Sequence, residues 1–140
     1  MPAFLFKTEP DDYSFADLVR DGRVVWEGVR NPTALIHLRT VKKGDQVAIY
    51  HTGGEKRVVG LARVSRGAYA DPKLDDPRRV VVDLAPVREL QQPVALATFR
   101  VDPVLRETEL VRISRLSVMP LSAAQLARVL ALGGDTRARR

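Results

Sequence analysis

The sequence has no cysteine, two histidines and a single tryptophan among its 140 residues. Without cysteine it can form no disulfide, no thiolate nucleophile and no cysteine-ligated metal site. The two histidines, His37 and His51, are too few for a dedicated transition-metal site. P-loop, GxGxxG and GxSxG motifs are absent as well. We therefore expect no cofactor, although a missing motif does not by itself exclude catalysis.

Long apolar runs are also missing. No stretch approaches the roughly 20 residues that a membrane-spanning helix needs, and Lys7, Glu9 and two prolines interrupt the N-terminal MPAFLFKTEP before it could serve as a secretory signal. We expect a soluble cytoplasmic protein, with association to the nucleoid, or a nuclear location in a eukaryote, left open. The length fits one domain, 1–134, followed by a basic tail, 135–140.

The charge balance is basic, with a formal net charge of +6 and a pI near 10.2. Such a balance favours polyanionic partners, and arginine suits phosphate because its planar fork binds bidentately. However, the terminal TRARR contributes Arg137, Arg139 and Arg140, which amount to half of that excess. Charge alone therefore leaves both nucleic-acid binding and an ordinary solvated basic face open.

Hydrophobic patterning and turn residues predict the elements of the first half of the chain. Ser14 is placed to cap a helix that Asp21-Gly22 ends, and Asn31-Pro32 begins a second helix that the turn at 42–45 stops. The Gly-Gly loop in TGGEK predicts a hairpin between two β-rich runs. The expected strands are 4–7, 46–51 and 57–65.

The second half begins with a charged, turn-rich loop over 67–79 and a strand over 79–90, in which Pro86 favours an edge or a bulge. The stretch 98–114 stays undecided between helix and irregular structure because Pro103 interrupts it. A short strand over 115–120 precedes a helix that Ser122 caps and Gly133 ends. Together these patterns predict an α+β domain with a small, strongly curved sheet or barrel.

Two polar residues are candidates for chemistry. His51 follows Tyr50 at the end of a strand and could act as a general base, but the same position suits a local hydrogen bond. Glu9 leaves the first strand and could accept from the exocyclic amine of a base, or it could pair with Lys7 or a nearby arginine. Neither alternative is decided by the sequence.

Four aromatic residues lie at element ends or in connections: Tyr13, Trp26, Tyr50 and Tyr69. Rings in such places can stack on a planar ligand, and they can equally be core residues. Trp26 is followed by Arg30 and by the helix start at Asn31-Pro32, a combination that favours anions. This spacing permits a base and its phosphate to be held together.

Six segments resemble, in order, the EVE domain, a PUA-like domain related to the YTH and ASCH domains. They are FLFKTEPDDYSF, VVWEGVRNPTA, KKGDQVAIYHTGG, VVGLARV, AYADP and RLSVMPLS, and they extend over most of the chain from residue 4 to about 132. The resemblance implies a PUA-like pseudobarrel of about five or six strands with peripheral short helices. One departure is Phe4, which stands where the family commonly has tryptophan.

The resemblance also implies a non-enzymatic reader that takes a modified base, such as 5-methylcytosine, 5-hydroxymethylcytosine or N6-methyladenine, into an aromatic-lined pocket by base flipping. Arg30 and Arg115 are the expected phosphate-binding residues. The expected base-pocket residues are Lys7, Glu9, Ser14, Trp26, Val29, Asn31, Tyr50, His51 and Ser117.

Our hypothesis is that Trp26 and Tyr50 lie against the two faces of the base while Glu9, Asn31 and Ser117 read its edge. The expected partner is DNA or RNA carrying a modified base, bound by a monomer without a membrane. Two alternatives remain open at this stage. One is an RNA-binding PUA-like module. The other is a hydrolase that acts on modified nucleosides, with His51 or Glu9 as its general base.

Overall fold

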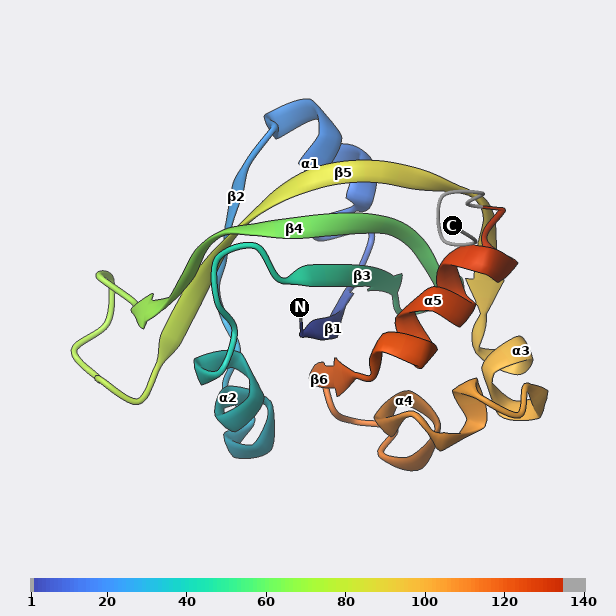
Figure 1. Cartoon of the computed structure of the whole chain (residues 1–140). Coiled ribbons are helices and arrows are strands. Elements are labelled where there is room, and N and C mark those ends of the chain that lie inside the picture. The colour runs from blue at the N-terminus through green and yellow to red at the C-terminus, as the bar shows by residue number, and fades with distance from the viewer. Residues whose placement is uncertain (1, 135–140) are drawn as a thin grey trace.

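The computed structural model describes residues 2–134 and shows a curved sheet with helices along its rims (Figure 1). The basic tail predicted over 135–140 lies outside the described residues. Within them, no helix is long and apolar enough to cross a membrane. The elements in chain order are β1 (Ala3–Thr8), α1 (Phe15–Asp21), β2 (Val24–Trp26), α2 (Pro32–Arg39), β3 (Gln46–His51), β4 (Arg57–Ala70), β5 (Val80–Ala95), α3 (Leu96–Val101), η1 (Leu105–Glu107), α4 (Glu109–Arg112), β6 (Val118–Leu121) and α5 (Ala123–Leu132).

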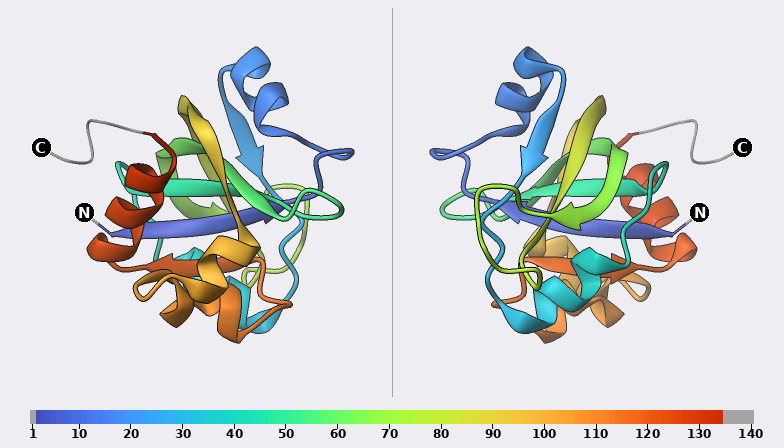
Figure 2. Two further views of the ribbon diagram at one scale, coloured as in Figure 1. Left: turned by 90° about the vertical axis from the view of Figure 1, so that its right-hand side faces the viewer. Right: turned by 90° about the vertical axis from the view of Figure 1, so that its left-hand side faces the viewer.

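The sheet has six strands in the order β2-β5-β4-β3-β1-β6. Only the β1–β3 pair is parallel among these neighbours, and the other pairs are antiparallel. The long strands β4 and β5 arch over the shorter β3 and β1, while α2, α4 and α5 lie along the opposite side (Figures 1 and 2). The predicted α+β class and strand number are confirmed. The sheet is curved like a pseudobarrel but is not closed, because β2 and β6 are its two edges.

The helix ends follow the predicted capping chemistry. The side chain of Ser14 accepts from the backbone of Asp17, whose carboxylate accepts in turn from the Ser14 backbone, and Ser122 with Gln125 forms the same reciprocal pair at α5. Asn31 caps α2 by accepting from the backbone of Ala34. These bonds satisfy N–H groups that have no partner inside their helices.

The core is built around β1, where Leu5 and Phe6 are fully buried. Phe4 is also part of this core, 3% exposed, with its ring centroid 6.4 Å from that of Phe6. Its departure from the family's usual tryptophan is therefore a matter of core packing. Gly60 of β4 is needed here because a Cβ at that position would lie 2.5 Å from the ring of Phe15.

The structure corrects four expectations about element bounds. Val24–Trp26, left between helices in the sequence, is a strand paired with β5. β4 continues to Ala70 and β5 to Ala95, so the predicted loop 67–79 is shorter and the strand 79–90 is longer. Register shifts along this pair let the strands bend and accommodate Pro86 opposite Ala62. The last strand begins at Val118 rather than at 115, and the undecided stretch forms α3, η1 and α4.

Candidate functional site

A pocket of about 430 Å³ opens where β1 ends, and we call it the Trp26 pocket. Its walls come from the end of β1, the turn that leads to α1, strand β2 and the segment that follows it, with Ser117 from the connection before β6. Six of the predicted site residues line it together: Lys7, Glu9, Trp26, Val29, Arg30 and Ser117. Tertiary structure thus gathers residues from three separate stretches of the sequence into one site.

Trp26 forms part of the pocket wall rather than standing free in it. Its ring centroid lies 5.7 Å from that of Phe6 and 6.5 Å from that of Tyr13, and the residue is 9% exposed. The indole N–H donates to no acceptor in residues 2–134, where Ser65 Oγ is the sole buried side-chain polar atom without a partner. The indole nitrogen therefore keeps some contact with solvent.

Tyr13, predicted only as one of four aromatic candidates, also lines the pocket. Its ring stands nearly edge-on to Trp26, at 84°, and its hydroxyl donates to Asp21 at 2.9 Å. Burial, together with that hydrogen bond and the charge of Asp21, raises the pKa of the Tyr13 phenol to about 12. The ring is therefore held as a fixed wall beside Trp26. Further lining residues that the prediction omitted are Thr8, Asp12, Val24, Val25, Glu27 and Gly28.

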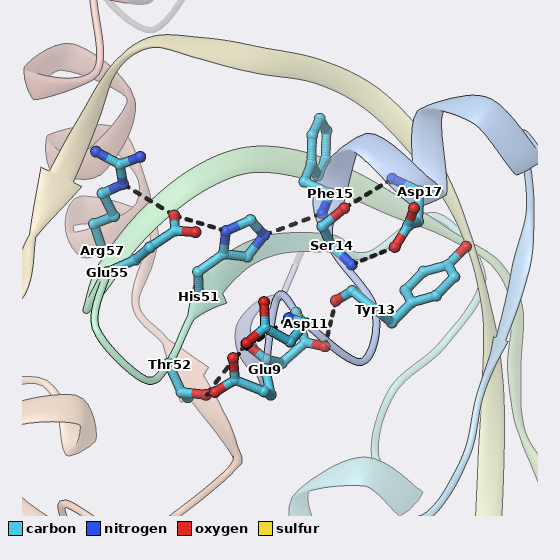
Figure 3. Close-up of polar contacts among 11 residues, drawn as sticks. Glu9, Asp11, Tyr13, Ser14, Phe15, Asp17, His51, Thr52, Glu55 and Arg57 are labelled. Carbon is cyan, nitrogen blue, oxygen red and sulfur yellow. Dashed lines mark hydrogen bonds and ion pairs between the residues drawn. The ribbon is translucent and has the colours of Figure 1, made fainter.

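The carboxylate of Glu9 is fixed by its neighbours (Figure 3). One oxygen accepts from the hydroxyl of Thr52 at 3.2 Å, and the other accepts from the backbone N–H of Asp11 at 3.3 Å. A Cβ on Gly53 would lie 2.7 Å from this carboxylate, so only glycine leaves room for it there. Glu9 makes no ion pair in the described residues, and the ammonium of Lys7 bonds to a carbonyl instead. The predicted alternative of an ion pair between Glu9 and Lys7 or a nearby arginine is therefore not what the structure shows.

Two cations and two further carboxylates complete the lining. The ammonium of Lys7 donates to the carbonyl of Ser114 at 2.7 Å, and partial burial lowers the pKa of Lys7. Arg30 is exposed at the rim. Of the remaining acids, Glu27 pairs with Lys73 at 3.2 Å, while Asp12 is exposed. The pocket therefore combines acceptors with positive charge at its edge.

Tyr50 is placed elsewhere. It lines a second pocket, of about 290 Å³, together with Lys56, Arg100 and Ser114. Lys7 lines both pockets, and its ammonium lies 5.9 Å from the centroid of the Tyr50 ring. Burial raises the pKa of the Tyr50 phenol. Trp26 and Tyr50 thus belong to different pockets, so these linings do not place them on the two faces of one base.

The other expected site residues do not line the Trp26 pocket. Ser14 and Asn31 are helix caps. His51 is 7% exposed, with Nε2 accepting from the backbone of Phe15 and Nδ1 3.0 Å from Glu55 (Figure 3). Arg115 is exposed in the connection between α4 and β6. Both ring nitrogens of His51 are therefore occupied, so a general-base role would require breaking these bonds.

The fold and the pocket define an α+β domain that presents a mixed-charge pocket at the end of β1. The chain belongs to the EVE domain family, whose model matches residues 3–132. In the part of the chain that the structure describes, no three histidine or acidic side chains gather as a metal ion would require.

Solved and curated relatives agree with this assignment. A protein from Rhodopseudomonas palustris superposes with a TM-score of 0.90 at 35% identity, covering 96% of this chain and 94% of that one. Human thymocyte nuclear protein 1 is 27% identical over 92% of this chain and 72% of its own length. The human THYN1 protein in complex with 5-methylcytosine-containing DNA gives a TM-score of 0.86 at 26% identity, covering 95% of this chain and 98% of that chain.

A more distant structure shares the fold alone. The YTH domain of the MRB1 protein of Zygosaccharomyces rouxii, in complex with N6-methyladenosine RNA, gives a TM-score of 0.57 at 15% identity, covering 94% of this chain and 86% of that chain. The predicted structural relation to YTH domains is thus confirmed.

Proposed function

We propose that this protein binds nucleic acid carrying a modified base and receives that base, taken out of its stack, in the Trp26 pocket. The volume of about 430 Å³ suits a small planar ligand. Its walls are two fixed aromatic rings and several valines, and its rim carries Lys7 and Arg30. Taking a base out of a duplex costs a few kcal/mol, which contacts to the base and phosphate together can offset.

The observation that carries the proposal is that one pocket is lined both by a hydrogen-bond donor without a protein partner and by an acceptor held in a fixed position. The Trp26 indole N–H lacks a protein acceptor, and the Glu9 carboxylate is held by Thr52 and Asp11. Cytosine presents an exocyclic amine beside ring acceptors, so Glu9 would accept from the amine while Trp26 donates to an acceptor on the same edge. Thymine presents a carbonyl in place of that amine, and Glu9 would repel it.

Recognition of a methyl group depends on the apolar part of the lining. Val24, Val25 and Val29 line the pocket, and Val25 is substantially exposed. Burying one methyl group contributes about 0.8 kcal/mol, or roughly a fourfold preference. Modest selectivity for 5-methylcytosine over cytosine follows from this contact alone, and a fitted shape would increase it. The human relative solved with 5-methylcytosine-containing DNA supports the same class of ligand.

Calorimetric titration with two DNA duplexes that differ only in one 5-methyl group tests the proposal. We expect tighter binding of the methylated duplex and loss of that preference in Trp26→Ala. A Glu9→Gln variant should retain the fold and lose part of the preference for an amine-bearing base, because the amide can also present a donor.

Equal affinity for both duplexes in the wild type, unchanged in Trp26→Ala, would contradict the proposal. An RNA of the same sequence, with and without the methyl group, should be titrated in parallel. Tighter binding of RNA regardless of methylation would instead favour the RNA-binding module that the sequence left open.

A further inference from the structure

A further hollow, distinct from the pocket that Tyr50 lines, lies next to the Trp26 pocket, between α2 and the connection that joins β4 to β5. It has a volume of about 390 Å³, and we call it the arginine groove. In Figure 2 the loop between β4 and β5 lies close to α2 when the left-hand side of the molecule faces the viewer. Four arginines line this groove, Arg30, Arg39, Arg78 and Arg79, against a single acid, Asp76.

Two of these four arginines are held in place by backbone carbonyls. Arg39 donates to the carbonyl of Arg78 at 2.7 Å, and Arg79 donates to the carbonyl of Val29 at 3.1 Å. A carbonyl fixes a guanidinium but leaves its charge and its other donors free. Only Arg78 pairs with the acid, at 3.1 Å, and neither Arg39 nor Arg79 forms an ion pair within residues 2–134.

The groove is continuous with the Trp26 pocket. Arg30 lines both cavities, and Val29, whose carbonyl holds Arg79, lines the pocket. A strand whose base enters the pocket can continue through its sugar and phosphates past Arg30, which the two cavities share. The four arginines and one aspartate of the groove leave an excess of three positive charges. This charge complements a polyanion that extends from the pocket into the groove.

We infer that the arginine groove binds the sugar-phosphate backbone of DNA on one side of the base held in the Trp26 pocket. This inference rests on the proposed function. Arg39 and Arg79 each take a phosphate oxygen, since a guanidinium fork matches phosphate geometry. Such contacts fix the register of the strand and carry no base information. The groove therefore contributes affinity, while the pocket contributes selectivity.

Salt dependence separates these two contributions. Binding of a fluorescent duplex with one central 5-methylcytosine, and of its unmethylated twin, is measured by anisotropy between about 50 and 200 mM NaCl. In Arg39→Gln and in Arg79→Gln, the slope of log affinity against log salt should become shallower by about 1 per lost phosphate contact. Affinity for both duplexes should fall by the same factor, so that their ratio stays at the wild-type value.

Two further variants serve as controls. Arg39→Lys keeps the charge and should keep the wild-type slope. Arg106→Gln removes the same charge from an exposed position in η1, between α3 and α4 and away from α2, and should change neither slope nor ratio (Figure 1).

An unchanged slope in both groove variants, or wild-type protein that binds no DNA, would overturn the inference. A shallower slope in a protein that does not distinguish the two duplexes would support the groove and contradict the modified-base function. If the groove variants keep both the wild-type ratio of affinities for the two duplexes and the wild-type salt slope, the proposed modified-base function is supported and the groove has no part in it.

Discussion

The imidazole of His51 accepts a hydrogen bond from the backbone N–H of Phe15 at 3.0 Å, joining the end of β3 to the first turn of α1. Because Nε2 accepts, the neutral ring carries its proton on Nδ1 and donates it to Glu55, also at 3.0 Å. This bond with His51 lowers the pKa of the Glu55 carboxyl. The arrangement makes His51 a positioning residue for α1, the helix that ends at Asp21, whose carboxylate holds the hydroxyl of Tyr13.

Replacing His51 by alanine should lower the free energy of unfolding by about 1 to 3 kcal/mol, because a buried backbone N–H loses its acceptor. Urea unfolding followed by circular dichroism measures this loss. His37→Ala, on the partly exposed side of α2, is the matched control and should change stability by less than about 0.5 kcal/mol. Equal effects in the two variants would contradict the assignment of His51 as a structural link.

Gly53→Ala should weaken binding of the modified base and reduce stability. The added Cβ would lie 2.7 Å from a Glu9 carboxylate oxygen, and the residue has φ of 71°, which costs a non-glycine residue roughly 1 kcal/mol. Gly54→Ala is the control, since nothing lies within 4 Å of its Cβ position. Parallel calorimetry and thermal unfolding of the two variants check this. A Gly54 effect as large as that of Gly53 would speak against Glu9 as the group displaced.

Trp26→Phe should preserve much of the aromatic wall while removing the indole N–H that reaches solvent. The loss of one hydrogen bond to the ligand corresponds to about 0.5 to 1.5 kcal/mol, or roughly a two- to tenfold weaker affinity. Titration with the methylated duplex measures the change. Tyr13→Phe, which removes a hydroxyl bonded to Asp21 and not to the ligand, should affect affinity less. The reverse order would show that Tyr13, and not Trp26, supplies the donor.

Asp83 should make the protein sensitive to acid. Burial of its carboxyl opposes ionisation, but hydrogen bonds from Tyr69 and Arg23, at 2.5 and 2.6 Å, outweigh it and lower the pKa below 3.8. A carboxyl with a lowered folded-state pKa stabilises the fold above its unfolded-state pKa. That contribution is lost as the pH falls from about 3.8 through the lower folded-state pKa.

In Asp83→Asn, the stability should be lower at neutral pH and should fall less steeply below pH 4 than in the wild type. Unfolding in urea at several pH values measures both effects. Asp75→Asn, at an exposed position in the connection after β4, should reproduce the wild-type profile. A profile of Asp83→Asn parallel to the wild type would show that this carboxyl is not responsible for the acid sensitivity.

The local features of this protein are encoded by residues that are close together in the sequence. Ser14, Asn31 and Ser122 predicted the starts of three helices because capping depends on residues only three positions apart. The hairpin between β3 and β4 was predictable for the same reason, and the ordered motifs identified the EVE domain family.

Tertiary structure decided the rest. Val24–Trp26 becomes a strand only through pairing with β5, some 60 positions further along, which no local pattern encodes. The hypothesis built on the family resemblance placed Tyr50 opposite Trp26, yet strand pairing sets Tyr50 beside Lys7 of β1, and Tyr50 lines a different pocket. The arginine groove likewise joins α2 to the β4–β5 connection, because strand pairing and helix packing bring together residues that are distant in the chain.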